Sequence, residues 1–239
     1  MKNHVLITGA SRGIGAATAE LFAAEGWELT LTCMHHPDQL HQLAERLGDV
    51  SSSPIRTRVG DVADPAFAET LFSDLPPVSV LINNAGIAHI GLLQDTSAED
   101  WNRVLSVNLS GPFYMIKAAL PGMLREKDGR ILNISSVWGN VGGAMETAYS
   151  ASKGGLNALT KALAKELAPS KIAVNAIAFG CVDTEMNACF SEEERATLAE
   201  EIPAGRFATT AEAAEIIFRA AQLPAYVTGQ ILTADGGWS

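Results

Sequence analysis

A tyrosine and a lysine four residues apart carry the clearest chemical signal in the chain. Tyr149 and Lys153 stand in the stretch AYSASKGGL, and a helix over that stretch would place both side chains on one face. A nearby ammonium group favours the ionised phenol and is expected to lower the pKa of Tyr149 from its free value of about 10. Such a phenol is a useful proton donor near neutral pH. By itself the spacing equally suits a solvated lysine beside a half-buried tyrosine.

Three glycines follow a short apolar run near the N-terminus. Residues 5–7 read as a buried strand, and the sequence TGASRGIG over residues 8–15 leads into a helical pattern. Gly9, Gly13 and Gly15 lack side chains where the backbone must turn tightly and where a pyrophosphate must approach the amides of a helix start. No lysine follows the last glycine, which disfavours a site for nucleoside triphosphates. The pattern predicts a dinucleotide site, with a glycine turn that binds no ligand as the alternative.

Taken together, the motifs of the chain resemble those of the short-chain dehydrogenase/reductase family over nearly its whole length. They are, in order, TGASRGIG from Thr8, Asp61-Val62, NNAG from Asn83, Asn108, Ser136, Tyr149 with Lys153, and the tail from Thr228 to Gly237. Within the family the chain is most similar to bacterial 3-oxoacyl-acyl-carrier-protein reductases. That group is close to dehydrogenases of steroids, sugars and small alcohols.

The resemblance implies a role for each matched residue. Tyr149 would deliver a proton to the oxygen of a ketone, and Ser136 would hydrogen-bond the same oxygen. Lys153 would also hold the nicotinamide ribose, and Asn108 would hold a water in the proton relay. The residues expected to bind the cofactor are Gly9, Ser11, Arg12, Gly13, Ile14, Gly15, Asp61, Val62, Asn83, Ala85, Gly86, Tyr149, Lys153, Val182 and Thr184. No metal site is expected.

The end of the second predicted strand indicates which cofactor is used. Enzymes that prefer NAD usually place a carboxylate there to accept hydrogen bonds from the ribose 2′-hydroxyl, but residues 33–36 are CMHH and the first acid is Asp38. Arg12 could instead pair with a 2′-phosphate, as a basic residue often does in family members that use NADP. We therefore predict NADP(H) in preference to NAD(H). The alternative for Arg12 is a solvated surface residue.

Short apolar runs alternate with helical patterns, which predicts a parallel sheet covered by helices on both faces. Strands are expected at 4–8, 28–33, 55–59, 78–82, 130–135, 172–177 and 229–233. Helices are expected at 13–25, 37–47, 65–74, 97–126, 149–168 and 211–221, the fourth interrupted by Gly111-Pro112 and by Pro121. The prediction is an α/β, doubly wound, Rossmann-type fold of about seven strands in a single domain over residues 1–239.

Composition limits the classes of partner. A net charge of −10 over 239 residues argues against a nucleic-acid partner, which would need a basic face. No apolar run approaches the ~20 residues that span a bilayer, and the first residues do not resemble a secretory signal, so a cytoplasmic protein is expected. Cys33, Cys181 and Cys189 form no C-x-x-C pair, which suggests neither a disulfide framework nor a zinc site. The family resemblance implies a homotetramer.

The substrate is expected to be a small-molecule ketone, foremost a 3-oxoacyl thioester, with steroids, sugars and small cyclic ketones as alternatives. The resemblance implies a substrate lid near residues 183–203, and Trp138 could form part of the pocket wall. Acyl carrier protein is a possible partner, but the basic loops expected to dock it are reduced to Lys127 and Lys171. Phe179 stands where the family usually has proline and is expected to reshape the pocket.

Two alternatives belong to other classes of protein. The stretch from Gly9 to Gly13 matches the G-x-S-x-G elbow of esterases with Ser11 as nucleophile, but that fold needs a histidine late in the chain and the last one is His89. A non-catalytic NADP-binding sensor would usually have lost a catalytic residue, and none is lost here. The sequence therefore predicts NADP(H)-dependent reduction of a ketone to a secondary alcohol by hydride transfer.

Overall fold

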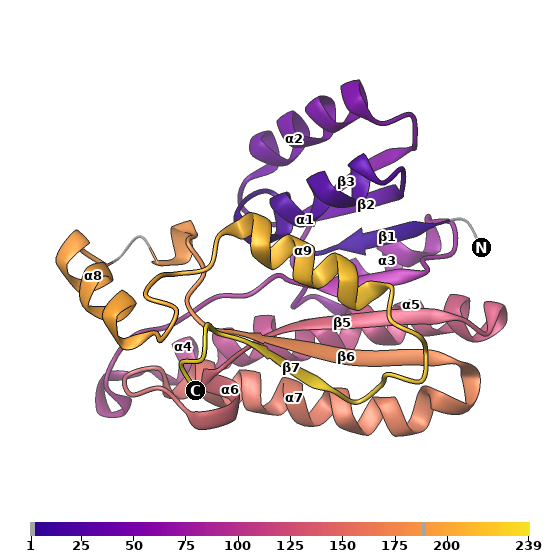
Figure 1. Cartoon of the computed structure of the whole chain (residues 1–239). Coiled ribbons are helices and arrows are strands. Elements are labelled where there is room, and N and C mark those ends of the chain that lie inside the picture. The colour runs from indigo at the N-terminus through magenta and orange to yellow at the C-terminus, as the bar shows by residue number, and fades with distance from the viewer. Residues whose placement is uncertain (1–2, 188–189) are drawn as a thin grey trace.

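Seven parallel strands form one sheet in the computed structural model, which describes residues 3–187 and 190–239 and leaves Cys189 outside (Figure 1). Their bounds are β1 His4–Ile7, β2 Glu28–Cys33, β3 Ile55–Val59, β4 Val80–Asn83, β5 Gly129–Ser136, β6 Ile172–Phe179 and β7 Ile231–Ala234. The order across the sheet is β3-β2-β1-β4-β5-β6-β7, so the direction of winding reverses between β1 and β4. The predicted doubly wound fold is confirmed, with every strand end within two residues of its predicted position.

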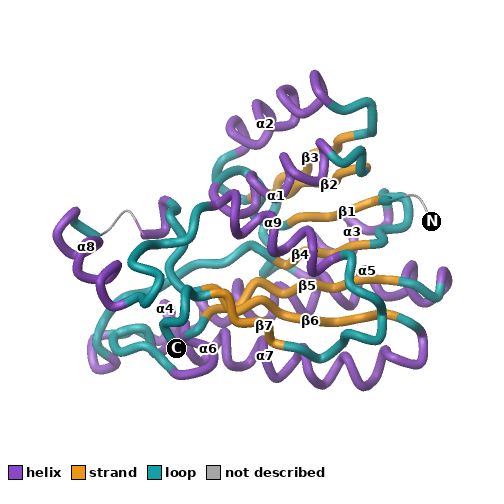
Figure 2. Tube along the Cα trace, in the orientation of Figure 1, coloured by secondary structure: helices purple, strands orange, loops and turns teal. Residues whose placement is uncertain are grey.

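Helices cover both faces of this sheet (Figure 2). On one face lie α1 Gly13–Ala24, α2 Pro37–Val50 and α9 Thr210–Ala221, and on the other α3 Pro65–Ser73, α4 Ala98–Leu105, α5 Gly111–Glu126 and α7 Thr147–Leu167. Each face has its own apolar core. In the first, Phe22 packs edge-on against Trp27 and Phe218 at centroid distances of 5.0 and 4.9 Å. Such pairs add about 1 kcal/mol each beyond their buried area.

The long fourth helix of the prediction is broken around Asn108. α4 ends at Leu105, a π-helical turn spans Ser106–Ser110, and α5 then continues through Pro121 to Glu126. The prediction that Pro121 interrupts the helix is wrong. Pro121 is exposed, so water can bind the carbonyl that its missing N–H leaves free. The break lies at the π-helical turn, which directs the fully buried side chain of Asn108 inward.

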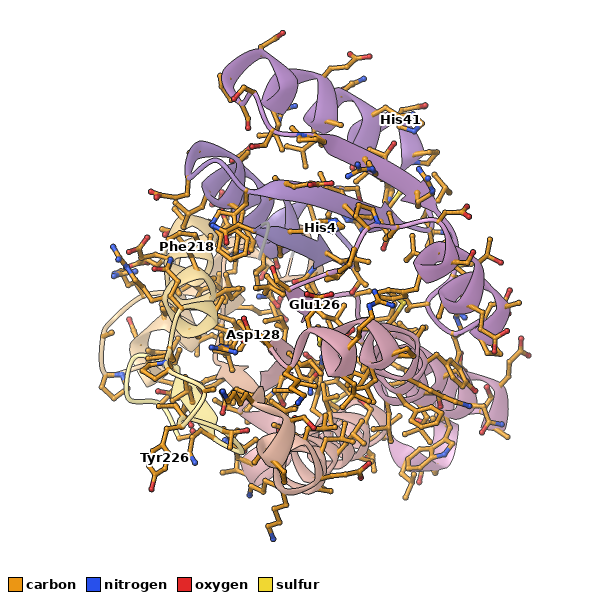
Figure 3. All side chains as sticks on the ribbon, turned by 90° about the vertical axis from the view of Figure 1, so that its right-hand side faces the viewer. His4, His41, Glu126, Asp128, Phe218 and Tyr226 are labelled. Carbon is orange, nitrogen blue, oxygen red and sulfur yellow. The ribbon has the colours of Figure 1, made fainter. Side chains whose placement is uncertain are left out.

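Several short elements were not predicted. They are η1 Leu93–Asp95, α6 Trp138–Val141, η3 Ala168–Ser170, η4 Glu185–Asn187 and α8 Glu192–Glu201. The last two lie beyond the carboxyl ends of the strands, at the same end of the molecule as the C-terminus (Figure 1). Figure 3 views the opposite end, where β1 begins at His4 and where Glu126 and Asp128 flank the turn into β5. Within the described ranges, no helix has the length and apolarity needed to cross a membrane.

Candidate active site

A cavity of about 360 Å³ opens beyond the carboxyl ends of the strands. One part, the loop half, is lined by residues 9 and 11–14, by 32–36 at the end of β2, and by 60–62 and Arg103. Thr184 and Glu185, which lie beside Gly13 and Arg12, also belong to the loop half. The other part, the tyrosine half, is lined by residues 134–138, 179–182 and 186–187 and by Glu146, Tyr149, Lys153, Phe190, Leu198 and Trp238. The two halves meet along Asn84, Ala85 and Gly86, which follow β4.

The glycine loop is fixed by contacts that leave no room for side chains. Gly9 has a φ of 64°, and a Cβ there would lie 2.8 Å from the Cα of Ala85. A Cβ on Gly15 would lie 2.3 Å from the carbonyl oxygen of Gly9. α1 begins at Gly13, and its N-cap residue Arg12 makes no capping hydrogen bond with its side chain. The helix start is therefore open to an anion, which fits the pyrophosphate of a dinucleotide.

Asn84 ties this loop to the end of β4. Its side-chain amide donates hydrogen bonds to the carbonyl oxygens of Thr8 and Gly9, at 2.9 and 3.0 Å. The backbone N–H groups of Asn84 and Ala85 in turn both donate to the hydroxyl of Thr8 at 3.0 Å. These four bonds make the glycine loop and the β4 turn one rigid unit.

Charged side chains in the loop half are paired with one another. Arg12 forms an ion pair with Glu185 of η4, and both side chains are about half exposed. Arg103 of α4 donates to Asp61 at 2.7 Å and also contacts the sulfur of Met34 at 3.3 Å. The end of β2 contributes no carboxylate to the cavity, as the sequence indicated, because its lining residues are Thr32, Cys33, Met34, His35 and His36.

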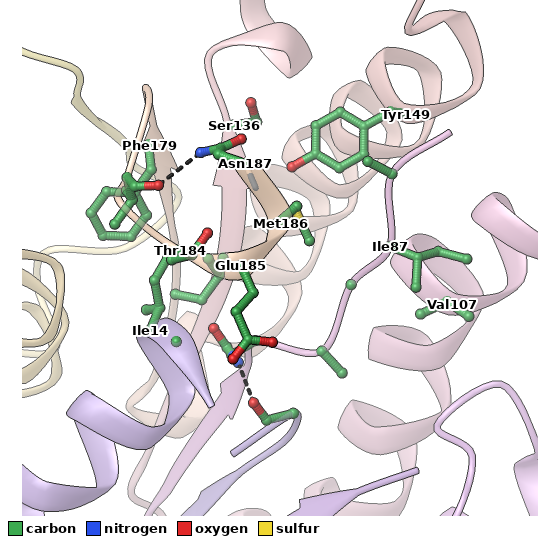
Figure 4. A pocket seen from close by; sticks show the side chains of 18 of the residues that line it. Ile14, Ile87, Val107, Ser136, Tyr149, Phe179, Thr184, Glu185, Met186 and Asn187 are labelled. Carbon is green, nitrogen blue, oxygen red and sulfur yellow. Dashed lines mark hydrogen bonds between the residues drawn. The ribbon is translucent and has the colours of Figure 1, made fainter. Parts of the chain in front are cut away.

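The tyrosine half brings together Ser136, the last residue of β5, and two residues of α7. The phenol oxygen of Tyr149 points into the cavity, toward the segment that carries Met186 and Asn187 (Figure 4). The Nζ atom of Lys153 lies 5.4 Å from the centre of the Tyr149 ring and donates a 2.7 Å hydrogen bond to the carbonyl of Ile134. The two side chains thus share one helix face, as their spacing predicts.

The protonation of this pair differs from the prediction. Burial and, to a smaller extent, the charge of Glu146 raise the pKa of Tyr149 to about 12, although a hydrogen bond with Ser136 lowers it. Burial also lowers the pKa of Lys153 to about 8. The expectation of a lowered pKa for Tyr149 is therefore wrong for the protein by itself, because desolvation and the charge of Glu146 raise it.

Two predicted asparagines lie behind the cavity wall. Asn108 accepts a hydrogen bond from the N–H of Ile87 at 2.9 Å and donates to the carbonyl of Ile87 at 2.8 Å, with a further bond to Ser152 of α7. Asn83 donates to Asn133 of β5 at 2.8 Å. Both are buried supports: Asn108 holds the chain after β4 against α7, and Asn83 joins β4 to β5.

The predicted site residues therefore separate into two groups. Those that line the cavity are Gly9, Ser11, Arg12, Gly13, Ile14, Asp61, Val62, Ala85, Gly86, Ser136, Tyr149, Lys153, Val182 and Thr184, and those behind it are Gly15, Asn83 and Asn108. The side-chain amide of Asn83 turns toward Asn133, and a cofactor contact of Asn83 stays a prediction. Lining residues that sequence reasoning missed are Asn84, Arg103, Glu146 and Trp238. Asn84 could have been found, since it belongs to the NNAG motif.

Phe179 lies at the end of β6 and is only 4% exposed. Its ring packs into the core under α1 and α9, beside Ile134 and Val182, and Figure 4 shows it across the strands from Tyr149. It therefore contributes to the cavity wall without entering the space beside Tyr149. Trp138 does form part of the wall, as predicted, and its ring lies 5.0 Å from that of Trp238 in the C-terminal tail.

Comparison with known proteins agrees with this geometry. The family model described as short chain dehydrogenase matches residues 3–195. An uncharacterized oxidoreductase of Bacillus subtilis is 38% identical over 100% of this chain and 99% of its own length. The 3-oxoacyl-acyl-carrier-protein reductase of Thermotoga maritima is 40% identical, over 97% of this chain and 96% of that protein.

Solved structures give the same result. A variant of actinorhodin polyketide ketoreductase, crystallised with NADPH, superposes with a TM-score of 0.94 at 32% identity, covering 99% of this chain and 97% of that one. A 3-oxoacyl-acyl-carrier-protein reductase from Brucella melitensis has a TM-score of 0.93 at 31% identity, covering 100% of this chain and 92% of that one. The chain belongs to the short-chain dehydrogenase family.

Proposed function

We propose that the protein reduces a 3-oxoacyl thioester to the corresponding secondary alcohol, with NADP(H) as the hydride donor. The observation that carries this proposal is the position of the Tyr149 hydroxyl. It points into a cavity that continues, past Gly86, into a glycine-lined groove whose helix start suits a pyrophosphate. A proton donor beside a dinucleotide groove is what carbonyl reduction by hydride transfer requires.

Each half of the cavity has a separate task in this proposal. The open N–H groups at the start of α1 bind the pyrophosphate, and Val62 and Asp61 bound the far end of the groove. Ser136 binds the substrate oxygen, while Tyr149 gives that oxygen a proton. Lys153 is placed to hold the nicotinamide ribose. NADP(H), when bound, supplies the hydride. Asn108 orders this region through Ile87, and its place in a water relay is part of the proposal.

NADP(H) is preferred over NAD(H) in this proposal. The absence of an acid at the end of β2 removes the usual partner of a ribose 2′-hydroxyl, and Arg12 lines the same part of the cavity. Arg12 can pair with a 2′-phosphate in place of Glu185. Relatives support the choice, because the actinorhodin ketoreductase variant was crystallised with NADPH.

The thioester assignment rests on the relatives named as 3-oxoacyl reductases. The positions of the two basic residues give less support to docking of acyl carrier protein at the cavity of the same chain. Lys127 follows α5 and Lys171 precedes β6, so both lie at the end of the sheet opposite the cavity, where α5 ends and β6 begins (Figure 1). They could guide a carrier protein only to the site of another copy, which agrees with the proposed homotetramer.

Residues 183–203 act as the lid over the substrate, since Met186, Phe190 and Leu198 line the cavity.

NADPH oxidation tests the proposal directly. The purified protein is assayed with acetoacetyl thioesters of coenzyme A and of acyl carrier protein, and with a steroid ketone, a keto sugar and a cyclic ketone. We expect the highest kcat/KM with a thioester. A higher value with a steroid, sugar or cyclic ketone would contradict the substrate class, while no oxidation with any ketone would contradict the reaction. Sedimentation in the same buffer tests the tetramer, and fractionation of cells tests the cytoplasmic location.

A further inference from the structure

Glu146 places a carboxylate inside the tyrosine half, three residues before Tyr149. It occupies the N-cap position of α7, where a short polar side chain such as Ser, Thr, Asp or Asn usually accepts a hydrogen bond from the first turn of the helix. Glu146 makes no such bond. Its carboxylate instead accepts a side-chain hydrogen bond from Trp138. The group is therefore turned away from its ordinary structural role and toward the cavity.

The loop before α7 holds Glu146 in this orientation. Met145 adopts a left-handed conformation with a φ of 63°, which is uncommon for a residue with a side chain. Its carbonyl accepts a 2.8 Å hydrogen bond from the N–H of Gly91, and the N–H of Gly143 donates to Ser150 at 2.9 Å. The strained residue is thus fixed by bonds on both sides. Strain of this kind that persists in a folded protein is often found at functional sites.

The charge of Glu146 is not neutralised by an ion pair. Among the charged residues that line the cavity, Arg12 pairs with Glu185 and Arg103 pairs with Asp61. Glu146 forms no ion pair with any residue in the described part of the chain, and the buried Lys153 donates to a backbone carbonyl. The substrate side of the cavity therefore carries, among the described residues, a carboxylate without an ion pair.

The field of this carboxylate reaches the reacting groups. Its charge raises the pKa of both Tyr149 and Cys181, which lie on different elements around the tyrosine half. Burial raises the pKa of Glu146 itself, while the bond from Trp138 lowers it. A second anion in the same enclosed space would face this charge at low effective dielectric, where repulsion is strong.

We propose that Glu146 is a specificity-determining residue that excludes 3-oxo acids, whose carboxylate lies one methylene from the reacting ketone, so that the site accepts the neutral esters and thioesters. The inference rests on the proposed reduction of 3-oxoacyl compounds and adds a repulsive element to it. A thioester differs from its free acid by this charge. The residue thereby prevents reduction of the hydrolysed 3-oxo acid, which presents the same ketone.

A matched pair of substrates tests the proposal. Wild type and Glu146→Gln are compared for NADPH-dependent reduction of ethyl acetoacetate and of acetoacetate. Glutamine keeps an oxygen that can accept the bond from Trp138 and removes only the charge. We expect the ratio of kcat/KM for the ester over that for the anion to fall about tenfold or more, mainly through a lower KM for acetoacetate.

Glu45→Gln is the control, because Glu45 is exposed on α2, lies outside the cavity lining and the lid, and changes the net charge equally. An unchanged ratio in Glu146→Gln, or an equal fall in Glu45→Gln, would overturn the proposal. Calorimetric binding of ethyl 3-hydroxybutyrate and 3-hydroxybutyrate repeats the comparison without turnover. If no ketone is reduced, the proposed function is wrong, while the binding ratio still decides the role of Glu146.

Discussion

The two halves of the cavity are built in different ways. In the loop half the main chain forms much of the surface. The backbone packs so closely around Gly9 and Gly15 that neither position has room for a methyl group. In the tyrosine half, side chains from β5, α7, the segment after β6 and the C-terminal tail converge from distant parts of the sequence. A backbone surface recognises what all dinucleotides share, whereas a surface of convergent side chains can change with the substrate.

The charged groups of the two halves also differ, in their pairing and in their exposure to water. The charged groups of the loop half are paired with each other and are partly exposed. Those of the tyrosine half, Glu146 and Lys153, have shifted pKa values because they are removed from water. Shifted values mark groups whose protonation can be changed by a ligand, which is the property that proton transfer needs.

The largest effect is expected from Tyr149→Phe in the tyrosine half. The change removes the proposed proton donor and leaves Ser136, Lys153 and the loop half in place. The turnover number should fall about a hundredfold or more, while the Kd for NADPH stays within about threefold of wild type. Steady-state assays and fluorescence titration measure the two quantities. Turnover within tenfold of wild type would show that another group donates the proton.

Gly15→Ala tests the loop half. The new Cβ would lie 2.3 Å from the carbonyl oxygen of Gly9, so the loop must shift and the pyrophosphate site is lost. We expect the Kd for NADPH to rise about thirtyfold or more. Gly48→Ala, in exposed helix α2 with no atom within 4 Å of the new Cβ, is the control and should leave binding unchanged. Equal behaviour of the two variants would show that the loop tolerates a side chain.

Arg12→Ala sharpens the assignment of the cofactor. Loss of the guanidinium group should reduce the preference for NADPH over NADH, measured as the ratio of kcat/KM, by about tenfold. Glu185→Gln keeps Arg12 and removes its partner, so the preference should be kept or increased. A preference that survives in Arg12→Ala would assign the 2′-phosphate to other residues of the loop half.

The smallest expected effect is that of pH on ketone reduction. Tyr149, with its pKa raised to about 12, stays protonated as an acid throughout the neutral range. Lys153, with its pKa lowered to about 8, is charged below that pH and loses its proton above it. The kcat/KM should therefore change by no more than about twofold from pH 6 to 8 and then decline. A steady rise with pH would contradict this assignment.

The sequence predicted the loop half better than the tyrosine half. Strands, helix starts and glycine turns follow local rules, so the ends of β1 and β4 and their turn residues could be located within two residues. At the end of β4 neighbouring side chains lie on opposite faces, so Asn83 turns toward Asn133 while Asn84 faces the loop. That alternation follows from strand geometry and was available from the sequence.

The long-range contacts that were missed had no local signal. In the loop half Arg103 reaches Asp61 across 42 residues of sequence, and in the tyrosine half Trp238 lies against Trp138, a hundred positions earlier in the chain. The raised pKa of Tyr149 could not be predicted either. The spacing to Lys153 indicated one cause of a shift, while burial and Glu146 became visible only in three dimensions.

The position of the last residues has a practical consequence. Asp235 accepts hydrogen bonds from the N–H groups of Gly237 and Ser239, and this turn seats Trp238 in the cavity wall. An affinity tag or fluorescent fusion attached after Ser239 would emerge at the mouth of the site. Such an appendage belongs before β1, at the far end of the sheet, if kinetics and crystals are to report on the unobstructed enzyme.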